Sequence, residues 1–277
     1  MGDMANEGAY ELGIIGAGNM AEAITRGVLS AGLFRPDQLI AADVAPARRE
    51  LFERDLKVRA VEHPADAARG ARRLLLSVKP QQMVAALATI GEVLPPTALV
   101  ISIAAGVGTD FIERALGHGN AWRIVRTMPN TPMLVGQGMV AVAAGRNATA
   151  DDVADATRIF AAAASVISVD EDKLDAVTAM SGSGPAYFFY LVEQMVQAGV
   201  ELGLTPEQSH ELAAKTAIGA ATMLVSSTDS PQELRRKVTS PGGTTHAAIT
   251  HMESAGVGHS IVQAIKGAHQ RSRELGV

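Results

Sequence analysis

The stretch GIIGAGNMAEAI, residues 13–24, places small residues between a short apolar run and a helical pattern. Gly13, Gly16 and Gly18 occur where the run LGIIG, residues 12–16, gives way to that pattern. Glycine lets the backbone turn tightly, and the first amides of a helix have no partner inside the helix. A loop of this kind between a strand and a helix is typical of a site for a dinucleotide pyrophosphate. A tight turn without any ligand is the alternative.

Short apolar runs alternate with helical patterns through the first part of the chain. Strands are expected at residues 12–16, 38–43, 57–61, 72–78, 98–106, 122–130, 138–145 and 166–170. Helices are expected between them at residues 19–31, 45–55, 81–94, 109–116 and 151–163. Runs rich in Val, Ile and Leu that alternate with helices indicate βαβ units and a parallel sheet covered on both faces. We therefore predict an α/β fold, with a Rossmann-type, doubly wound and mainly parallel sheet, over residues 11–170.

The sequence after residue 170 lacks strand patterns. Helices are expected at residues 185–202, 205–226, 231–239, 244–255 and 257–275. These helices have no sheet to cover, so their apolar faces need another partner, and a second subunit is the simplest one. Residues 171–277 are therefore expected to form an all-helical substrate-binding and dimerisation domain. Residues 1–10 are expected to be a disordered or tag-like N-terminus.

The composition restricts the class of protein. The 277 residues carry a formal net charge of −5, which gives no general attraction to nucleic acids or anionic membranes. Cysteine is absent, which excludes disulfides, thiol nucleophiles and cysteine-ligated metals. His246 and His251 do not have the spacing of metal ligands on one helical face, so no metal site is predicted. No apolar signal core or membrane-length run occurs, so a cytoplasmic protein without nucleic-acid or membrane partners is expected.

The carboxyl ends of the predicted strands carry the residues expected to contact a dinucleotide, because ligands bind at that edge of an open α/β sheet. They are Ile15, Gly16, Ala17, Gly18, Asn19 and Met20 after the first strand, Asp43 after the second, Ser77, Val78, Lys79 and Pro80 after the fourth, Ile103, Ala104 and Ala105 after the fifth, and Asn130 in the turn RTMPNTP. A surface charge explains Lys79 equally well, and a rigid crossover between strands explains the RTMPNTP turn.

Asp43 bears on the choice between NADH and NADPH. An acidic residue near the end of the second strand accepts hydrogen bonds from the adenosine ribose of NAD and would repel the 2′-phosphate of NADP. Arg48 and Arg49 follow a few residues later and could compensate, although charged residues on a solvated helix are the simpler interpretation. The sequence leaves both cofactors open.

Two Ser/Gly-rich segments precede helices in the second half of the chain. The first, SGSGPAYFFY at residues 181–190, is interpreted as a loop that feeds a helix. Its backbone amides and small hydroxyls make Ser183 and Gly184 candidates for an anion or amide pocket. A purely structural turn between two helices is the alternative.

The second segment, SPGGTTHAAI at residues 240–249, has the same character. Pro241 stiffens the approach, the glycines allow close backbone approach, and Thr244 or Thr245 is expected to cap the following helix. Helix capping alone explains this segment, but two such helix N-termini in one domain favour a shared carboxylate-binding site.

The motifs together resemble one known family. GIIGAGNMAEAI, SVKPQ, SIAAGV, RTMPNTP, DAVTAMSGSGPAY and VTSPGGTTHAAI occur in the order, and at spacings similar to those, of the pyrroline-5-carboxylate reductases. The resemblance runs from about residue 11 to residue 275, and SPGGTT is its most specific part. It implies a Rossmann domain and a helical domain that interlocks with a second subunit, in a homodimer that often assembles further into a decamer.

The resemblance also implies an activity. The family reduces 1-pyrroline-5-carboxylate to L-proline, the last step of proline biosynthesis, with NADPH or NADH. At matching positions the substrate carboxylate would be bound by Ser240, Gly242, Gly243 and Thr244. Thr245 matches the family's active-site threonine and would hydrogen-bond the ring nitrogen. The chain departs from the family pattern at Asp43, where a small hydroxyl residue is common, and at His63–Pro64 after the third strand.

The chemistry of an imine agrees with these residue types. Reduction needs a hydride at the C=N carbon and a proton at nitrogen, and an imine nitrogen is basic enough to need no strong general acid. Positioning by loop amides would then carry much of the catalysis. One alternative is a related reductase for another imine or a 3-hydroxyacid, which usually depends on a lysine in its helical domain; Lys215 lacks the expected context. A non-catalytic nucleotide-binding protein is the other.

Overall fold

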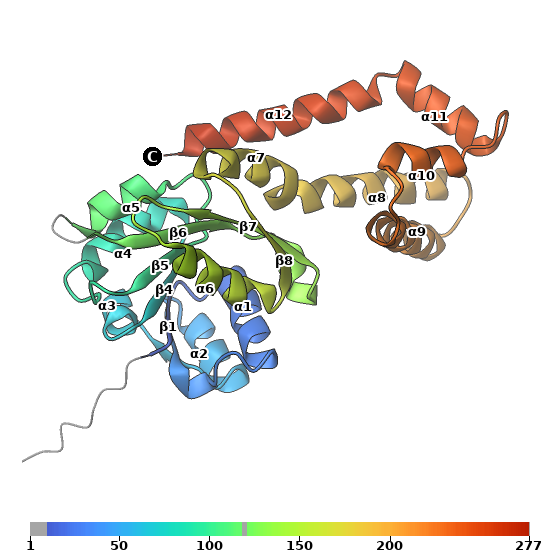
Figure 1. Ribbon diagram of the computed structural model, residues 1–277. Coiled ribbons are helices and arrows are strands. Elements are labelled where there is room, and N and C mark those ends of the chain that lie inside the picture. The colour runs from blue at the N-terminus through green and yellow to red at the C-terminus, as the bar shows by residue number, and fades with distance from the viewer. Residues whose placement is uncertain (1–9, 118–120, 277) are drawn as a thin grey trace, which may run out of the picture. The chain divides into compact units, whose positions relative to one another are not determined.

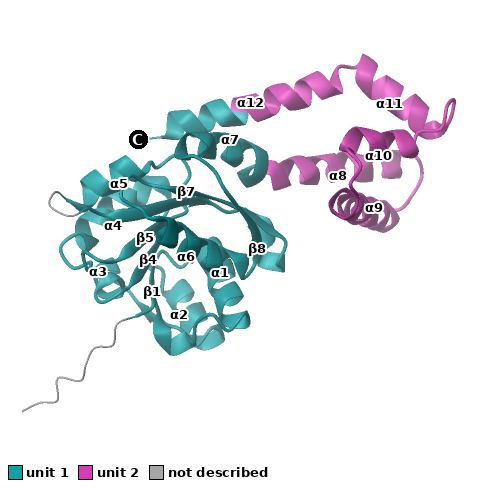
Figure 2. Ribbon diagram, viewed as in Figure 1, with its two compact units in different colours: residues 1–183, 268–277 teal, residues 184–267 magenta. Residues whose placement is uncertain are grey.

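The computed structural model describes residues 10–117 and 121–276. They divide into two units, Met1–Ser183 with Ala268–Val277 (unit 1) and Gly184–Gly267 (unit 2), shown in Figure 2. Of the segment predicted to be disordered or tag-like, residues 1–9 lie outside the described residues. Tyr10 is described, and its carbonyl accepts a hydrogen bond of 2.9 Å from the Arg72 amide.

Unit 1 is built on one eight-stranded sheet with the order β3-β2-β1-β4-β5-β6-β7-β8. The strands are β1 (Leu12–Ile15), β2 (Leu39–Ala42), β3 (Arg59–Val61), β4 (Arg73–Leu76), β5 (Leu99–Ser102), β6 (Arg123–Met128), β7 (Gly138–Ala144) and β8 (Ala164–Ser168). Neighbouring strands are parallel except β6 and β7, which are antiparallel. The doubly wound, mainly parallel sheet is confirmed.

Helices cover both faces of this sheet (Figure 1). They are α1 (Asn19–Ser30), α2 (Pro46–Asp55), α3 (Pro64–Ala68), α4 (Met83–Ile90), α5 (Thr109–Leu116) and α6 (Ala150–Ala161), with short 3₁₀ turns η1 (Pro36–Gln38), η2 (Pro80–Gln82) and η3 (Thr131–Val135). Ile14 packs in a buried cluster with residues of α1, α2 and α6, whereas its neighbour Ile15 packs with residues of α3, α4 and α5. This alternation follows from the two-residue period of a strand.

A continuous helical run leads out of unit 1. It consists of η4 (Glu171–Lys173), α7 (Leu174–Val177), a π-helical turn η5 (Thr178–Gly182) and the long helix α8 (Gly184–Glu201). The remaining helices are α9 (Pro206–Ser226), α10 (Pro231–Lys237), α11 (Thr244–Ser254) and α12 (Val257–Leu275). Every strand and helix expected from the sequence has a counterpart. The strand expected at residues 98–106 ends earlier, at Ser102, and Gly106 beyond it has a φ of +77°.

A buried arginine anchors this run within unit 1. Arg126 of β6 lies 3.5 Å from Glu171 and 3.7 Å from Asp175. Glu171 accepts hydrogen bonds from the amide and hydroxyl of Thr109, at 2.8 and 2.7 Å, and so caps the start of α5. Asp175 accepts one of 2.8 Å from the hydroxyl of Ser272, near the end of α12. The start of the helical run and the end of α12 are therefore tied to the sheet.

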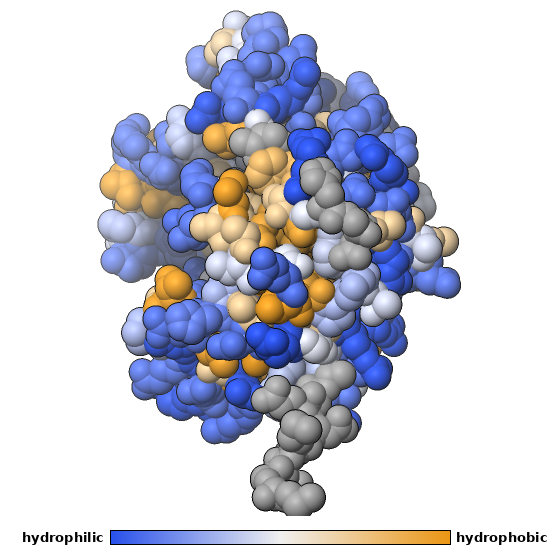
Figure 3. Space-filling view, turned by 90° about the vertical axis from the view of Figure 1, so that its left-hand side faces the viewer, coloured by the Kyte–Doolittle hydropathy of each residue, from blue (hydrophilic) through white to orange (hydrophobic). Residues whose placement is uncertain are grey.

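The surface of unit 1 is not uniformly polar. In the face that Figure 3 shows, hydrophobic side chains gather in the middle and hydrophilic ones surround them. Large exposed apolar side chains of unit 1 include Val44, Val84, Leu134 and Val135. Unit 2 differs more strongly, because only Gly184, Ser209 and Ala213 of its residues 184–267 are buried.

Candidate active site

A cleft of about 550 Å³ opens at the carboxyl ends of β1 to β4. Seven residues expected to contact a dinucleotide line it, namely Ile15, Gly16, Gly18, Asp43, Ser77, Val78 and Lys79. The other lining residues are Ala42, Val44, Glu62, Pro64, Gln81, Gln82, Ala85, Ala86 and Thr89. Pro64 belongs to the His63–Pro64 pair already noted after the third strand, whereas Glu62 was not predicted, although the rule that ligands bind at strand ends could have identified it.

The two glycines of the first loop are needed for different reasons. Gly16 has a φ of +94°, and a Cβ there would lie 2.7 Å from the Ser77 carbonyl oxygen, so the fold itself requires glycine. Gly18 has an ordinary φ of −69°, and a Cβ there would meet no atom within 4 Å. Neither backbone strain nor packing explains why residue 18 is a glycine. Open space at a cleft-lining glycine before a helix is what close approach of a pyrophosphate needs, so the loop fits a dinucleotide.

The amides of this loop have different partners. The Ala17 amide donates to the Asp43 carboxylate at 2.7 Å and is occupied within the protein. Helix α1 begins at Asn19, and no side chain caps it. The amides of Asn19, Met20 and Ala21 therefore have no acceptor inside the helix, and they present donors and the positive end of the helix dipole to an anion.

Arg48 and Arg49 of α2 turn to the loops instead of to solvent. Arg48 donates to the Ala17 carbonyl at 2.5 Å and pairs with Glu22 at 2.8 Å. Arg49 donates to the carbonyls of Asp43 and Val44, at 2.8 and 3.0 Å. The interpretation as charges on a solvated helix is therefore wrong, because unpaired loop carbonyls attract both guanidinium groups. Burial opposes ionisation of Glu22, but hydrogen bonds and charges from Arg48 and Arg26 hold the pKa of its carboxyl below the usual value.

The remaining expected cofactor residues do not line this cleft, and their contacts stay predictions. Ala17, Asn19, Met20 and Pro80 lie beside it in the chain, whereas Ile103, Ala104, Ala105 and Asn130 follow β5 and β6. The Asn130 side-chain amide already has hydrogen-bond partners within the protein. It donates to the carbonyl and hydroxyl of Ser181, at 3.3 and 3.2 Å, and accepts from the Met139 amide at 2.8 Å. Asn130 thus fixes the π-helical turn against β7.

The Ser/Gly loop expected at the start of residues 181–190 is not present, although the helix that it was expected to feed is α8. Residues 178–182 form the π-helical turn η5, and Ser183 continues it with its amide donated to the Thr178 carbonyl at 2.8 Å. No separate helix N-terminus is therefore available at Ser183 and Gly184, because α8 continues an existing helical run. A π-helical turn is rare and frequently occurs at functional sites, so substrate contact by these two residues stays a prediction.

The SPGGTT segment forms a tight turn between α10 and α11. Gly242 has a φ of +71°, and the Gly243 amide donates to the Ser240 carbonyl at 3.0 Å, as in a type II turn with proline at its second position. Gly243 is the N-cap of α11 and no side chain caps the helix. The expected capping by Thr244 or Thr245 is wrong, because the helix begins at Thr244 and both threonines lie within its first turn.

This geometry leaves several donors available. The amides of Thr244, Thr245 and His246 are the first three of α11 and have no acceptor inside the helix. The hydroxyls of Ser240 and Thr245 have no hydrogen-bond partner in the part of the chain that the structure describes. A helix N-terminus with neighbouring free hydroxyls suits a carboxylate. No hydrogen bond among the described residues joins this turn to Ser183 or Gly184.

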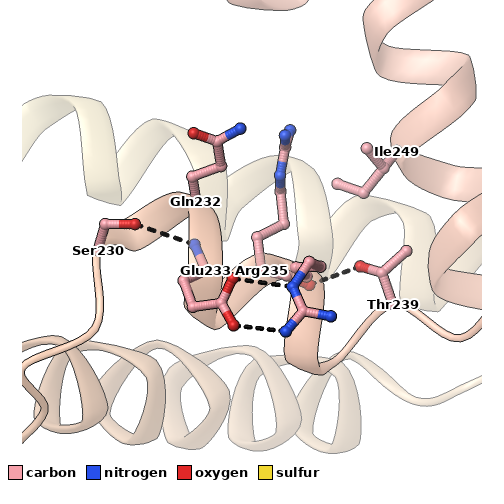
Figure 4. Close-up of a pocket in the computed structure, with 7 residues that line it drawn as sticks. Ser230, Gln232, Glu233, Arg235, Thr239 and Ile249 are labelled. Atoms are coloured by element: carbon pink, nitrogen blue, oxygen red, sulfur yellow. Dashed lines mark hydrogen bonds and ion pairs between the residues drawn. The ribbon is translucent and has the colours of Figure 1, made fainter.

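Helix α10 holds the approach to this turn (Figure 4). Arg236 pairs with Glu233 at 2.5 Å, and these hydrogen bonds lower the pKa of the Glu233 carboxyl. Arg235 pairs with Glu253 of α11 at 3.1 Å, and its carbonyl accepts a hydrogen bond of 2.6 Å from the Thr239 hydroxyl. Glu233, Arg235, Arg236 and Thr239 line a pocket of about 320 Å³ toward which Ile249 of α11 points. Of the two ion pairs, the one between Arg235 and Glu253 links α10 to α11 across the turn.

No group of three or more His, Asp or Glu side chains among the described residues could hold a metal ion. None of the helices the structure describes is long and apolar enough to cross a membrane. Lys215 lines a surface groove with Leu204 and Gln208, and no residue of the SPGGTT segment is among the lining residues of that groove.

Comparisons with known proteins agree with this geometry. A family model described as pyrroline-5-carboxylate reductase dimerisation matches residues 171–275, and one described as NADP oxidoreductase coenzyme F420-dependent matches residues 11–106. A pyrroline-5-carboxylate reductase of Synechocystis sp. is 40% identical over 97% of this chain and 99% of that protein.

Solved structures show the same likeness. A pyrroline-5-carboxylate reductase of Coxiella burnetii has a TM-score of 0.88 and 35% identity, over 97% of this chain and 99% of that one. A pyrroline carboxylate reductase of Plasmodium falciparum with NADP bound has a TM-score of 0.86 and 28% identity, over 97% of this chain and 98% of that one. The chain therefore belongs to the pyrroline-5-carboxylate reductase family.

Proposed function

We propose that this protein reduces 1-pyrroline-5-carboxylate to L-proline with NAD(P)H, as the last step of proline biosynthesis. The observation that carries the proposal is the SPGGTT turn, with free helix amides and two free hydroxyls, in a chain that also has a dinucleotide cleft. The substrate is a cyclic imine that bears a carboxylate, so it needs an anion site and a hydrogen-bond partner for nitrogen. NAD(P)H supplies the hydride for the C=N carbon.

The residues of the turn would bind two parts of the substrate, its carboxylate and its ring nitrogen. The amides of Thr244, Thr245 and His246 and the hydroxyl of Ser240 would bind the substrate carboxylate. Gly242 and Gly243 would shape the turn, because the Gly243 amide is already donated to Ser240. The Thr245 hydroxyl would hydrogen-bond the ring nitrogen and orient it for protonation. Ser183 and Gly184 would line the substrate pocket from the start of α8.

The dinucleotide would be held by unit 1. The amides of Gly18, Asn19 and Met20 would contact the pyrophosphate, and Ala17 would contribute through its hydrogen bond to Asp43. Around the rest of the cofactor would lie the residues after β1, β4, β5 and β6, which are Ile15, Gly16, Ser77, Val78, Lys79, Pro80, Ile103, Ala104, Ala105 and Asn130. Hydride transfer then depends chiefly on holding the two reactants in place.

A homodimer with interlocked C-terminal helices is part of the proposal, and assembly into a decamer extends it. The exposed apolar side chains of unit 2 support a partner subunit. The division of labour is residues 11–170 for the dinucleotide and residues 171–277 for substrate and dimerisation. We also propose a cytoplasmic location, where a biosynthetic reductase has access to reduced nicotinamide.

Thr245→Ala tests the role of the hydroxyl. The loss of one polar contact in the transition state is expected to raise the barrier by roughly 1–3 kcal/mol. Steady-state kinetics should show this mainly in kcat/KM for the imine, with dinucleotide affinity unchanged. Thr250→Ala, on the same helix, is the matched control and should behave like the wild type. An unchanged rate in Thr245→Ala would remove this threonine from the mechanism.

A further inference from the structure

The adenosine end of the cleft is built differently from its other end. The Asp43 carboxylate lines it and is held at both oxygens, by the Ala17 amide at 2.7 Å and the Ala45 amide at 2.8 Å. Two backbone donors from different loops fix the position of this negative charge. Asp43 therefore cannot turn aside for a ligand without breaking both hydrogen bonds.

A second carboxylate lies on the neighbouring strand. The Asp43 amide donates to the Val61 carbonyl at 3.1 Å, which sets the residue after Val61 beside the end of β2. That residue is Glu62, which lines the same cleft and has a side chain that is 60% exposed. Glu62 lies 3.6 Å from Arg49, too far for a hydrogen bond, so its charge is only partly balanced.

The nearby cations are committed elsewhere. Arg48 holds the Ala17 carbonyl and Glu22, and Arg49 holds the carbonyls of Asp43 and Val44. Neither arginine lines the cleft. Lys79 does line it but follows β4, and β4 is separated from β2 by β1, on the order of 10 Å away across the sheet. A 2′-phosphate next to Asp43 would meet two carboxylates and no available cation among the lining residues near β2 and β3.

We propose that Asp43 and Glu62 together determine cofactor specificity and make NADH the preferred hydride donor of this reductase. This inference rests on the proposed function. The ribose of NADH offers hydroxyl donors to the fixed carboxylate of Asp43, whereas the additional phosphate of NADPH is repelled by both acids. Arg49, which lies 3.6 Å from Glu62, could move toward such a phosphate only by releasing the two carbonyls that it holds.

The test is direct binding of NAD⁺ and NADP⁺ by calorimetry, with no substrate present. The wild type is expected to bind NAD⁺ about tenfold more tightly or better, the factor that charge repulsion of this kind supplies. Glu62→Gln removes one exposed charge and Asp43→Asn removes the fixed one, and each should reduce the preference. Raising the salt concentration should also reduce it, because ions screen the exposed Glu62 charge.

Two further variants serve as controls for these binding measurements. Asp37→Asn is the control, because Asp37 is an exposed acid in η1 at the opposite end of β2. It should leave both affinities unchanged. Asp43→Ser guards against local misfolding of the asparagine variant. Equal or tighter binding of NADP⁺ by the wild type overturns the inference while leaving the reductase function intact. So does an unchanged preference in the Glu62 and Asp43 variants. Failure to bind either nucleotide overturns both this inference and the proposed function.

Discussion

Unit 1 buries its large apolar side chains, whereas unit 2 exposes most of its own. In unit 1 two buried clusters cover the two faces of the sheet, with Phe52, Trp122 and Phe160 fully buried. In unit 2 only Gly184, Ser209 and Ala213 are buried, and four consecutive residues of α8, Phe188 to Leu191, are each at least 47% exposed. A helix that is apolar all round is a buried helix. Unit 1 therefore has the core of an independent domain, and unit 2 has the surface of half an interface.

The difference also separates two candidate sites within one chain. The cleft at the ends of β1 to β4 is assembled from loops that the buried sheet fixes, so its geometry depends on unit 1 alone. The SPGGTT turn lies between helices with little buried surface, so its geometry depends on whatever covers those helices. The dimerisation family model that matches residues 171–275 fits this requirement.

Phe189→Asp should produce the largest effect. Phe189 is 69% exposed on α8, and an unpaired charge buried in an interface costs several kcal/mol. The expected results are a monomer in sedimentation or light scattering and loss of reductase activity, with nucleotide binding retained by unit 1. Val84→Asp is the control, because Val84 is 61% exposed on α4 of unit 1 and should tolerate the charge. An unchanged oligomer in Phe189→Asp would show that this face is not an interface.

Phe160→Ala tests the same difference between the two units in unit 1. Phe160 of α6 is fully buried in unit 1, so its truncation is expected to destabilise that unit by about 3–5 kcal/mol. This loss of stability in unit 1 should not depend on protein concentration. The melting temperature of unit 2 should depend on it, because the stability of unit 2 comes from association. Thermal unfolding at several protein concentrations distinguishes the two. A melting transition of unit 2 that does not depend on protein concentration would show that unit 2 is stable without a partner subunit.

Glu22→Gln should give the smallest effect, about 1 kcal/mol or less, because one ion pair of this kind contributes little. The pKa of Glu22 is lowered in the folded protein, so the ion pair with Arg48 stabilises it at neutral pH, above the usual carboxyl value. That contribution is lost as the pH falls through the lower folded pKa. The difference in melting temperature between wild type and variant should therefore disappear in acid. A difference that persists there would point to packing instead of charge.

The sequence predicted the fold well because its signals are local. The strand–glycine–helix pattern at residues 13–24, the Val/Ile/Leu runs and the Pro and Gly punctuation each act within a few residues. Thr205, for example, caps α9 and Pro206 begins it, as short-range preferences favour. The cleft at the sheet edge could be predicted for the same reason, since the parallel strands β1 to β4 all end there.

The details that the sequence missed depend on long-range contacts. Arg48 reaches a carbonyl 31 residues earlier, so its position could not be read from a helix pattern. The π-helical turn before Gly184 depends on Asn130, far away in the chain, which binds Ser181. Ser-Gly-Ser-Gly is typical of a loop, but here Ser181 is held by Asn130 and Gly182 lies against Met128 of β6. The roles of individual site residues likewise depend on a bound substrate and stay predictions.

The most direct test of the account is a spectrophotometric assay with 1-pyrroline-5-carboxylate, run in parallel with NADH and NADPH. The account predicts loss of the reduced nicotinamide absorbance with formation of L-proline, faster with NADH than with NADPH. Asp43→Ser should shift the ratio of the two rates toward NADPH. Absence of turnover with both cofactors, from a folded and oligomeric protein, would contradict the proposed function.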